Sequence, residues 1–172
     1  MTGPMKDGGF EMDFSKFNQA FFEYALKTAP AAAEKGAWEA LRELKADCDN
    51  VAPKTPLLEG NLRGDHTLIL EGITQSKVEE KSGGKGKDHH KGGSKPAERF
   101  GALNIIAQLI FRMPYAAKWH EAIDKEWAEG GILWSESGAG PKYCESKMMM
   151  FAKKYMGMIA SAVKAAAEGG KK

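Results

Sequence analysis

The residues whose spacing could support chemistry lie in the segment MPYAAKWHEAID, which spans Met113–Asp124. Within it, HEAID places His120 and Glu121 at the positions that begin a zinc-protease signature. Such a site needs a second histidine four residues after the first, so that both imidazoles reach one zinc ion. Asp124 occupies that position, and the preceding residues have the pattern of a strand followed by Pro114. A metal-dependent hydrolase built on these three residues is therefore the least favoured hypothesis.

The other chemically active residue types form no recognisable catalytic or cofactor motif. Cys48 and Cys144 lack CxxC spacing, and we expect both thiols to be reduced and packed in the core of a protein made in the cytoplasm. Glu136 lies between two serines in a glycine-rich segment where serine commonly fills turns, and no Gly-x-Ser-x-Gly elbow occurs. His89 and His90 are adjacent in a glycine–lysine segment that also lacks the Walker pattern. We expect no enzymatic activity, no metal site and no cofactor.

Charge is distributed unevenly, although the 172 residues carry a net charge of only +2. Residues 1–50 contain 6 basic and 9 acidic side chains, residues 77–99 contain 7 basic and 4 acidic, and residues 141–172 contain 7 basic and 2 acidic. Separate acidic and basic zones can pair between neighbouring copies of a chain. They can equally be solvated helix faces that happen to segregate.

The size of the chain, 18.7 kDa, predicts a single domain over residues 1–172. The longest apolar run, at residues 103–111, is too short to cross a bilayer, and the N-terminus has no apolar signal region. Glycine and lysine dominate residues 77–99, which we expect to be a mobile loop. Residues 1–12 are expected to be flexible and residues 168–172 a frayed tail.

Hydrophobic periodicity predicts helices at both ends of the chain and strands between them. Apolar residues at 3–4 residue spacing predict three helices; the first bears Phe14, Phe17, Phe21 and Tyr24, the second Trp38, Leu41, Leu44 and Cys48, and the third Cys144, Met148, Phe151, Tyr155, Met158, Ala162 and Ala166. The first is expected to end or bend at Ala29-Pro30, the second to stop near Asp49-Asn50, and Pro141 to open the third. Residues 65–74 and 100–113 read as strands.

This order of elements is typical of an α+β fold. We expect N-terminal helices, a small antiparallel sheet whose long hairpin carries the mobile loop at its tip, and a C-terminal helix packed on the sheet.

Three short motifs occur in order between these elements: VAPKTPLLEGNLRGDHTL at residues 51–68, MPYAAKWHEA at residues 113–122 and GPKYCESKM at residues 140–148. Together they resemble the motifs of tailed-phage minor capsid and tail-completion proteins, which are head–tail connector subunits of the virion neck. The resemblance covers most of residues 30–160. It departs from the usual pattern at Leu58-Glu59, where Asp-Thr usually precedes the glycine, and at Cys144, where leucine is usual.

The resemblance implies a non-enzymatic structural protein of the virion that assembles in the host cytoplasm into a cyclic ring between portal and tail. Its partners would be copies of itself and the neighbouring portal, adaptor and tail proteins. It could also contact packaged DNA in the lumen, and no membrane partner is implied. Gly60 would permit a turn above Leu62, while Tyr115 and Trp119 would anchor the core. The residues expected to contact a neighbouring subunit or partner are Lys85, Lys87, Lys91, His120, Glu121, Lys153 and Lys154.

Two features favour an alternative, a nucleic-acid-binding accessory protein. These are the basic loop and the basic C-terminal helix, which could contact a phosphate backbone.

Overall fold

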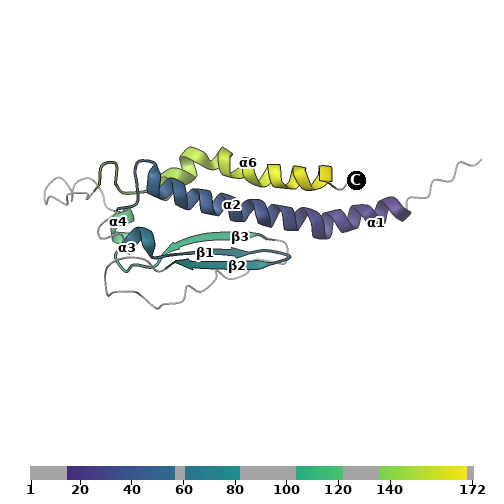
Figure 1. Ribbon diagram of the computed structural model, residues 1–172, viewed down its shortest axis with the longest axis horizontal. Coiled ribbons are helices and arrows are strands. Elements are labelled where there is room, and N and C mark those ends of the chain that lie inside the picture. The colour runs from purple at the N-terminus through teal and green to yellow at the C-terminus, as the bar shows by residue number, and fades with distance from the viewer. Residues whose placement is uncertain (1–14, 57–60, 82–103, 122–135, 170–172) are drawn as a thin grey trace, which may run out of the picture.

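The computed structural model describes residues 15–56, 61–81, 104–121 and 136–169, which form an elongated α+β structure with a helical layer above a small antiparallel sheet (Figure 1). The elements are α1 (Ser15–Glu23), the π-helical turn η1 (Tyr24–Thr28), α2 (Ala29–Asn50), α3 (Asn61–Gly64), β1 (His66–Glu71), β2 (Ser76–Lys81), β3 (Ile106–Phe111), α4 (Ala116–Glu121) and α6 (Glu145–Gly169). The expected fold class is confirmed.

The N-terminal helices form one uninterrupted helical segment from Ser15 to Asn50. The first helix does not end at Ala29-Pro30, because the backbone passes through the π-helical turn and the amide of Ala29 donates to the carbonyl oxygen of Tyr24. Proline has no amide hydrogen and its ring crowds the preceding helical turn. A wider turn immediately before Pro30 relieves that crowding and allows the helix to continue. The predicted stop of the second helix near Asn50 is confirmed.

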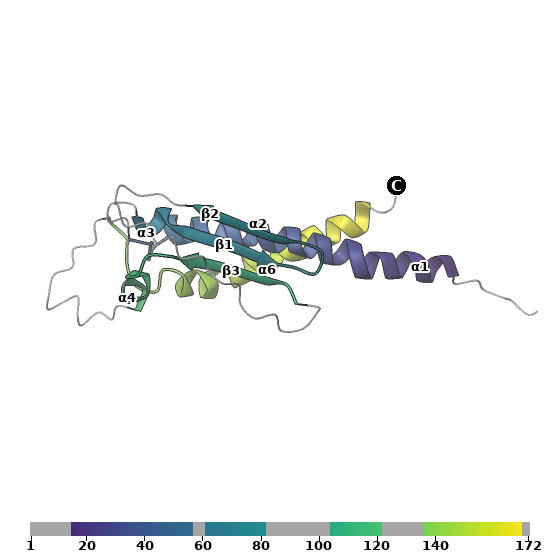
Figure 2. The same ribbon diagram turned by 90° about the horizontal axis from the view of Figure 1, so that it is seen from below.

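The C-terminal helix α6 packs along α2, and α2 contacts β1 and β3, so that the helical layer lies on one face of the sheet (Figure 2). Gly36 of α2 allows the close approach, since a Cβ atom there would lie 2.7 Å from the Cα of Ile159 in α6. The helix begins at Glu145, so the prediction that Pro141 opens it is wrong. The intervening Lys142 has a φ of 54°, which is incompatible with a helical turn at that residue.

The sheet has the strand order β2-β1-β3, and both pairings are antiparallel. The central strand β1 is buried along most of its length, and Leu68, Ile69 and Leu70 are almost fully enclosed. Leu68 pairs with Leu109 of β3 on one side and with Glu79 of β2 on the other. The predicted antiparallel pairing of the strands near residues 65–74 and 100–113 is therefore confirmed, although β3 is shorter than expected.

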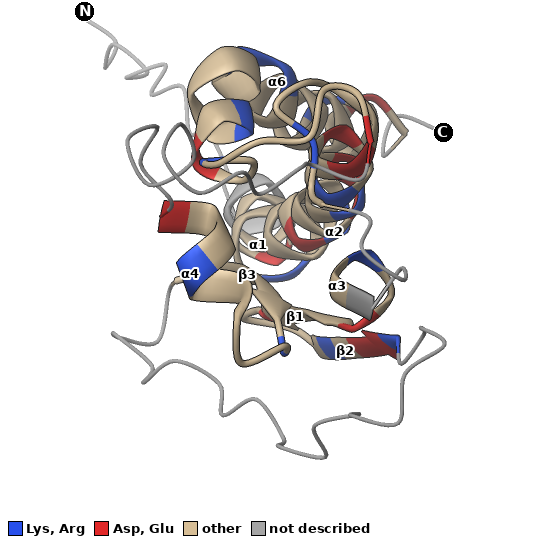
Figure 3. Ribbon diagram, turned by 90° about the vertical axis from the view of Figure 1, so that its left-hand side faces the viewer, with Lys and Arg blue, Asp and Glu red and all other residues tan. Residues whose placement is uncertain are grey.

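The edge strand β2 was not predicted, because residues 77–81 were assigned to the loop at 77–99. Its sequence, SKVEEK, has no apolar alternation, and its charged residues colour the ribbon at the edge of the sheet (Figure 3). A tight turn after β1, in which the Gly72 amide donates to the Gln75 carbonyl oxygen at 2.9 Å, returns the chain alongside β1. Charges on an edge strand oppose pairing with other chains. Because β2 carries charges in place of alternating apolar residues, hydrophobic periodicity does not detect it. The rest of that loop lies outside the described residues.

An apolar groove of about 200 Å³ runs between the helical layer and β3. Leu41 of α2, Leu109 of β3 and Met156 of α6 are among the residues that line it. Within the described ranges, no helix is both long and apolar enough to cross a membrane. The flexible N-terminus expected at residues 1–12 lies outside these ranges, whereas Glu168 and Gly169 of the expected frayed tail belong to α6.

Candidate functional site

The three motif segments meet at one end of the molecule, in a cluster that we call the corner. Its buried residues are Leu62 from the first motif, Met113 and Ala116 from the second, and Tyr143 from the third. Phe111, Tyr115, Trp119 and Cys144 pack against this cluster. The predicted packing of Leu62 in the core is confirmed, Tyr115 and Trp119 pack against the core but are only partly buried, and Gly60 lies outside the described residues. The corner therefore joins segments that are far apart in the sequence.

Tyr143 is the central side chain of the corner. It is 1% exposed, its hydroxyl donates to the carbonyl oxygen of Ala116 at 3.2 Å, and its ring meets the ring of Phe111 edge-on at 5.4 Å. Burial raises the pKa of the Tyr143 hydroxyl well above its usual range. The hydroxyl therefore remains a hydrogen-bond donor and fixes the third motif against the second.

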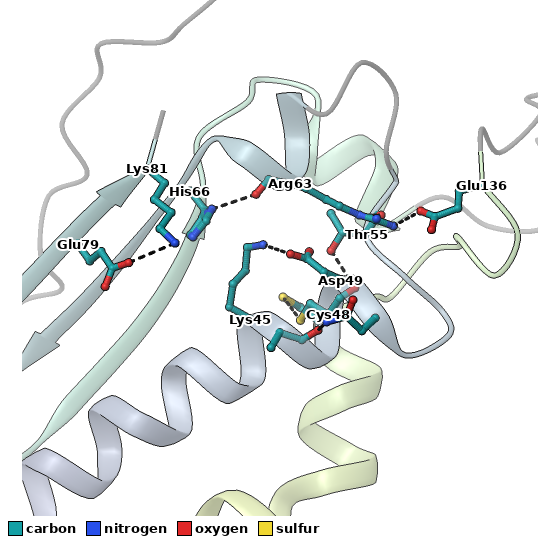
Figure 4. A network of polar contacts seen from close by, with 12 residues as sticks. Lys45, Cys48, Asp49, Thr55, Arg63, His66, Glu79, Lys81 and Glu136 are labelled. Carbon is teal, nitrogen blue, oxygen red and sulfur yellow. Dashed lines mark hydrogen bonds and ion pairs between the residues drawn. The ribbon is translucent and has the colours of Figure 1, made fainter. Parts of the chain in front are cut away.

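Ion pairs of Lys54, Arg63 and Asp65 fasten the first motif to residues that lie just before the other two motifs. Arg63 pairs with Glu136, which lies just before the third motif, and its Nε also donates to the carbonyl oxygen of Thr55 at 2.7 Å (Figure 4). Hydrogen bonding from the Arg63 guanidinium lowers the pKa of Glu136. Asp65 pairs with Arg112, which lies just before the second motif, at 2.5 Å. The Asp65 side chain is 1% exposed and the Arg112 side chain 9% exposed, so the pair of Asp65 with Arg112 is enclosed.

His120 and Glu121 lie at the solvent-facing side of the corner. The carbonyl oxygen of His120 accepts a hydrogen bond from the Lys142 amide at 2.8 Å. The imidazole ring of His120 meets the Tyr143 ring edge-on, with 4.9 Å between the ring centroids. Its Nδ1 lies 2.7 Å from a carboxylate oxygen of Glu121, which also pairs with the Lys142 ammonium. The hydrogen bond from Lys142 is the main cause of the lowered pKa of Glu121. Both residues thus connect α4 to the segment before α6.

The geometry of the three residues of the near-match to a zinc signature, His120, Glu121 and Asp124, is not defined as a set, because Asp124 lies outside the described part of the chain. Over the ranges that the structure describes, no three histidine, cysteine, aspartate or glutamate side chains are grouped closely enough to hold a metal ion. The contacts of His120 and Glu121 are with polypeptide groups of the corner.

The predicted contact residue Lys154 is engaged within its own chain. Its ammonium lies 2.6 Å from a carboxylate oxygen of Glu43 and 2.8 Å from one of Asp47, and these hydrogen bonds raise the pKa of Lys154. The Tyr155 hydroxyl donates to the same Asp47 carboxylate at 2.9 Å. The acidic helix α2 and the basic helix α6 therefore pair inside one subunit, whereas the charge zones suggested pairing between subunits. Lys153, by contrast, is exposed. Lys85, Lys87 and Lys91 lie outside the described residues.

A polar cleft of about 620 Å³ lies between the end of α2, α3 and the β1–β2 hairpin, and sequence reasoning did not identify it (Figure 4). Its charged lining pairs internally: Arg42 with Glu79 at 2.6 Å, and Lys45 with Asp49. His66 lines it too, 5% exposed, with Nδ1 placed 3.0 Å from the Arg63 carbonyl oxygen. Burial, followed by the nearby Lys45 ammonium, lowers the pKa of His66.

The sequence contained only one signal for the cleft, the opposite charges of Lys45 and Asp49 one helical turn apart. The remaining lining comes from three separate elements, so no local pattern could have indicated it. Among these pairs, the one between Arg42 and Glu79 links α2 to the β1–β2 hairpin.

Comparisons of this chain with protein-family models, with curated proteins and with solved structures gave no match.

Proposed function

We propose that this protein is a structural component of a tailed-bacteriophage virion that forms a ring in the neck, between the head portal and the tail. The observation that supports this proposal most strongly is the corner. The three motifs that carry the resemblance to head–tail connector subunits pack together there, through Leu62, Met113, Ala116 and Tyr143. The three motif segments are far apart in the sequence, yet each contributes a side chain to this one buried cluster.

The exposed apolar residues suit a subunit that contacts its neighbours through two different surfaces. One surface lies on α1 and η1, where Phe22 and Leu26 are 58% and 63% exposed. The other lies on the first half of α6, where Met149 and Met156 are 77% and 64% exposed. These surfaces lie toward opposite ends of the elongated molecule (Figure 1). Head-to-tail contact between two such surfaces closes a ring when the rotation per subunit fits.

The alternative, a nucleic-acid-binding accessory protein, receives less support from α6. Of its four lysines, Lys147 is buried and donates to the carbonyl oxygen of Pro53, and Lys154 pairs with two carboxylates of α2. Lys164 lies 3.8 Å from Glu168 on the same helix. A helix whose cations are mostly engaged by its own chain offers few of them to a phosphate backbone.

The assembly experiment combines the purified chain with its portal ring and measures bound mass by light scattering and particle shape by negative-stain electron microscopy. We expect an added ring for the native chain, and reduced assembly for Phe22→Ser and Met149→Ser, which alter the two apolar surfaces. Val78→Ser is the matched control, because Val78 is also exposed, at 61%, but lies on β2. A native chain that stays monomeric with the portal and is absent from virions would contradict the proposal.

A further inference from the structure

The two cysteines, which are 96 residues apart in sequence, face each other at the junction of α2 and α6. The Sγ atoms of Cys48 and Cys144 are 3.5 Å apart and are joined by the dashed line between the sulfurs in Figure 4. Cys48 is near the C-terminal end of α2 and is completely buried, whereas Cys144 immediately precedes α6 and is partly exposed. Cys48 is thus fully enclosed, whereas Cys144 is only partly buried.

The surroundings of the pair favour a thiolate on Cys144. Its main-chain carbonyl accepts hydrogen bonds from the amides of Lys147 and Met148, so its side chain lies at the N-terminal turn of α6, which is kinked farther along at Phe151. A hydrogen bond from the Cys48 thiol lowers the pKa of Cys144, and the ammonium groups of Lys45 and Lys147 act in the same direction, against burial and Asp49.

The same contact has the opposite effect on the buried partner. The hydrogen bond to Cys144 and then burial raise the pKa of Cys48. The ammonium of Lys147 is fully buried beside the pair and is held by the carbonyl oxygen of Pro53 at 2.8 Å. Burial lowers the pKa of Lys147, the two cysteines act against that shift, and Lys147 in turn lowers the pKa of Cys144, as neighbouring lysines do for reactive cysteines.

We propose that Cys48 and Cys144 form an oxidation site for hydrogen peroxide, with Cys144 as the attacking thiol and Cys48 as the resolving thiol. The Cys144 thiolate attacks one peroxide oxygen, the O–O bond breaks, and the departing hydroxide takes a proton to become water, which leaves a sulfenic acid on Cys144. The Cys48 sulfur then attacks the Cys144 sulfur, the S–O bond breaks, and the Cys48 proton leaves with the hydroxyl as a second water. The two thiols are oxidised to a disulfide and the peroxide is reduced to two waters.

Little movement is needed to form this bond. A disulfide requires a sulfur–sulfur distance of about 2.05 Å, so the two sulfurs must approach by about 1.5 Å, which side-chain rotation can provide. The product would link the end of α2 covalently to the start of α6, beside the corner. A cross-link between residues so far apart in sequence strongly restricts the unfolded chain, so oxidation should raise the unfolding temperature.

The test exposes the reduced, full-length protein to hydrogen peroxide and follows free thiols, intact mass and linked peptides. We expect one intramolecular disulfide, a mass lower by two hydrogen atoms, and reversal by dithiothreitol. Oxidation in the folded protein should be faster than in urea by on the order of tenfold or more, because unfolding removes the features that favour the thiolate. Two free thiols that persist in the folded protein, or cross-links only between chains, would overturn the proposal.

Single-cysteine variants test the order of the two steps. In Cys48→Ala, a sulfenic acid should accumulate on Cys144 and be trapped by dimedone, whereas in Cys144→Ala, Cys48 should stay unmodified under the same conditions. Because Cys48→Ala opens a small space in the core, circular dichroism must show that it is folded. Brief peroxide treatment of the native protein in the presence of dimedone gives the same information without a substitution. Trapping on Cys48 in place of Cys144 would contradict the assigned roles.

Discussion

Replacing Asp65 with alanine tests the ion pair that joins the first motif to Arg112, the residue just before the second motif. The substitution leaves the Arg112 guanidinium in a site where its side chain is 9% exposed and removes the Asp65 Oδ1 atom, which accepts from Nη2 at 2.5 Å and from Nε at 2.7 Å. Removing one partner of a buried ion pair typically costs about 3–5 kcal/mol of folding free energy. Arg112 keeps a hydrogen bond of 2.8 Å to the Lys81 carbonyl oxygen and a 3.4 Å contact with Glu80, so we expect the lower end, about 3 kcal/mol.

Urea unfolding followed by circular dichroism measures this loss. With a slope of about 2 kcal/mol per molar urea, a loss of about 3 kcal/mol lowers the midpoint by about 1.5 M while the slope stays unchanged. Glu80→Ala is the matched control, because Glu80 contacts the same guanidinium from a side chain that is 52% exposed. An exposed pair of this kind contributes about 0–1 kcal/mol.

A double-mutant cycle separates the ion pair from other effects of the substitution. Asp65→Ala combined with Arg112→Met removes both charges, and the double variant should be more stable than the sum of the single losses predicts. A loss below about 1 kcal/mol for Asp65→Ala would refute the assignment. Strictly additive losses would refute it as well, because they would mean that the two side chains do not act as a pair.

Four further outcomes follow from the structure. Gly36→Leu should lower stability by about 1–3 kcal/mol, because its side chain would meet the backbone at Ile159. Gly157→Ala should raise stability by about 0.5–1 kcal/mol, because the space around the added Cβ is open and alanine favours a helix more than glycine does. Thermal unfolding measures both changes. Burial lowers the pKa of His66, so the folded state binds this proton less readily than the unfolded chain does. The free energy of unfolding should therefore fall as pH decreases below about 7. His66→Gln should flatten that dependence in urea titrations at about pH 5–8. Lys153→Glu should weaken ring assembly at low salt, and assembly unchanged in light scattering would exclude a role for this exposed lysine.

The parts of the fold that the sequence predicted are those with strong local periodicity. The stripe containing Trp38, Leu41 and Cys48 specified α2, because one face of that helix must be buried. The anchors Tyr115 and Trp119 were predicted because large aromatic side chains after a strand and a proline need a core to pack in.

The parts that were missed depend on contacts between distant residues. Strand β2 is charged along its length, and only the free edge of β1 makes it a strand. The zones of opposite charge were visible in the sequence, but the Lys154 pairs with Glu43 and Asp47 depend on how α6 lies along α2. The same is true of the two cysteines, whose proximity follows from the tertiary structure alone.

The most direct test of the proposed function is an electron cryomicroscopy reconstruction of the neck of virions whose phage encodes this chain. The account predicts a ring between portal and tail into which the α2–α6 pair and the three-stranded sheet fit, with α1 of each copy lying against α6 of its neighbour. A neck in which every ring is formed by other proteins, from particles that lack this chain by mass spectrometry, would contradict it.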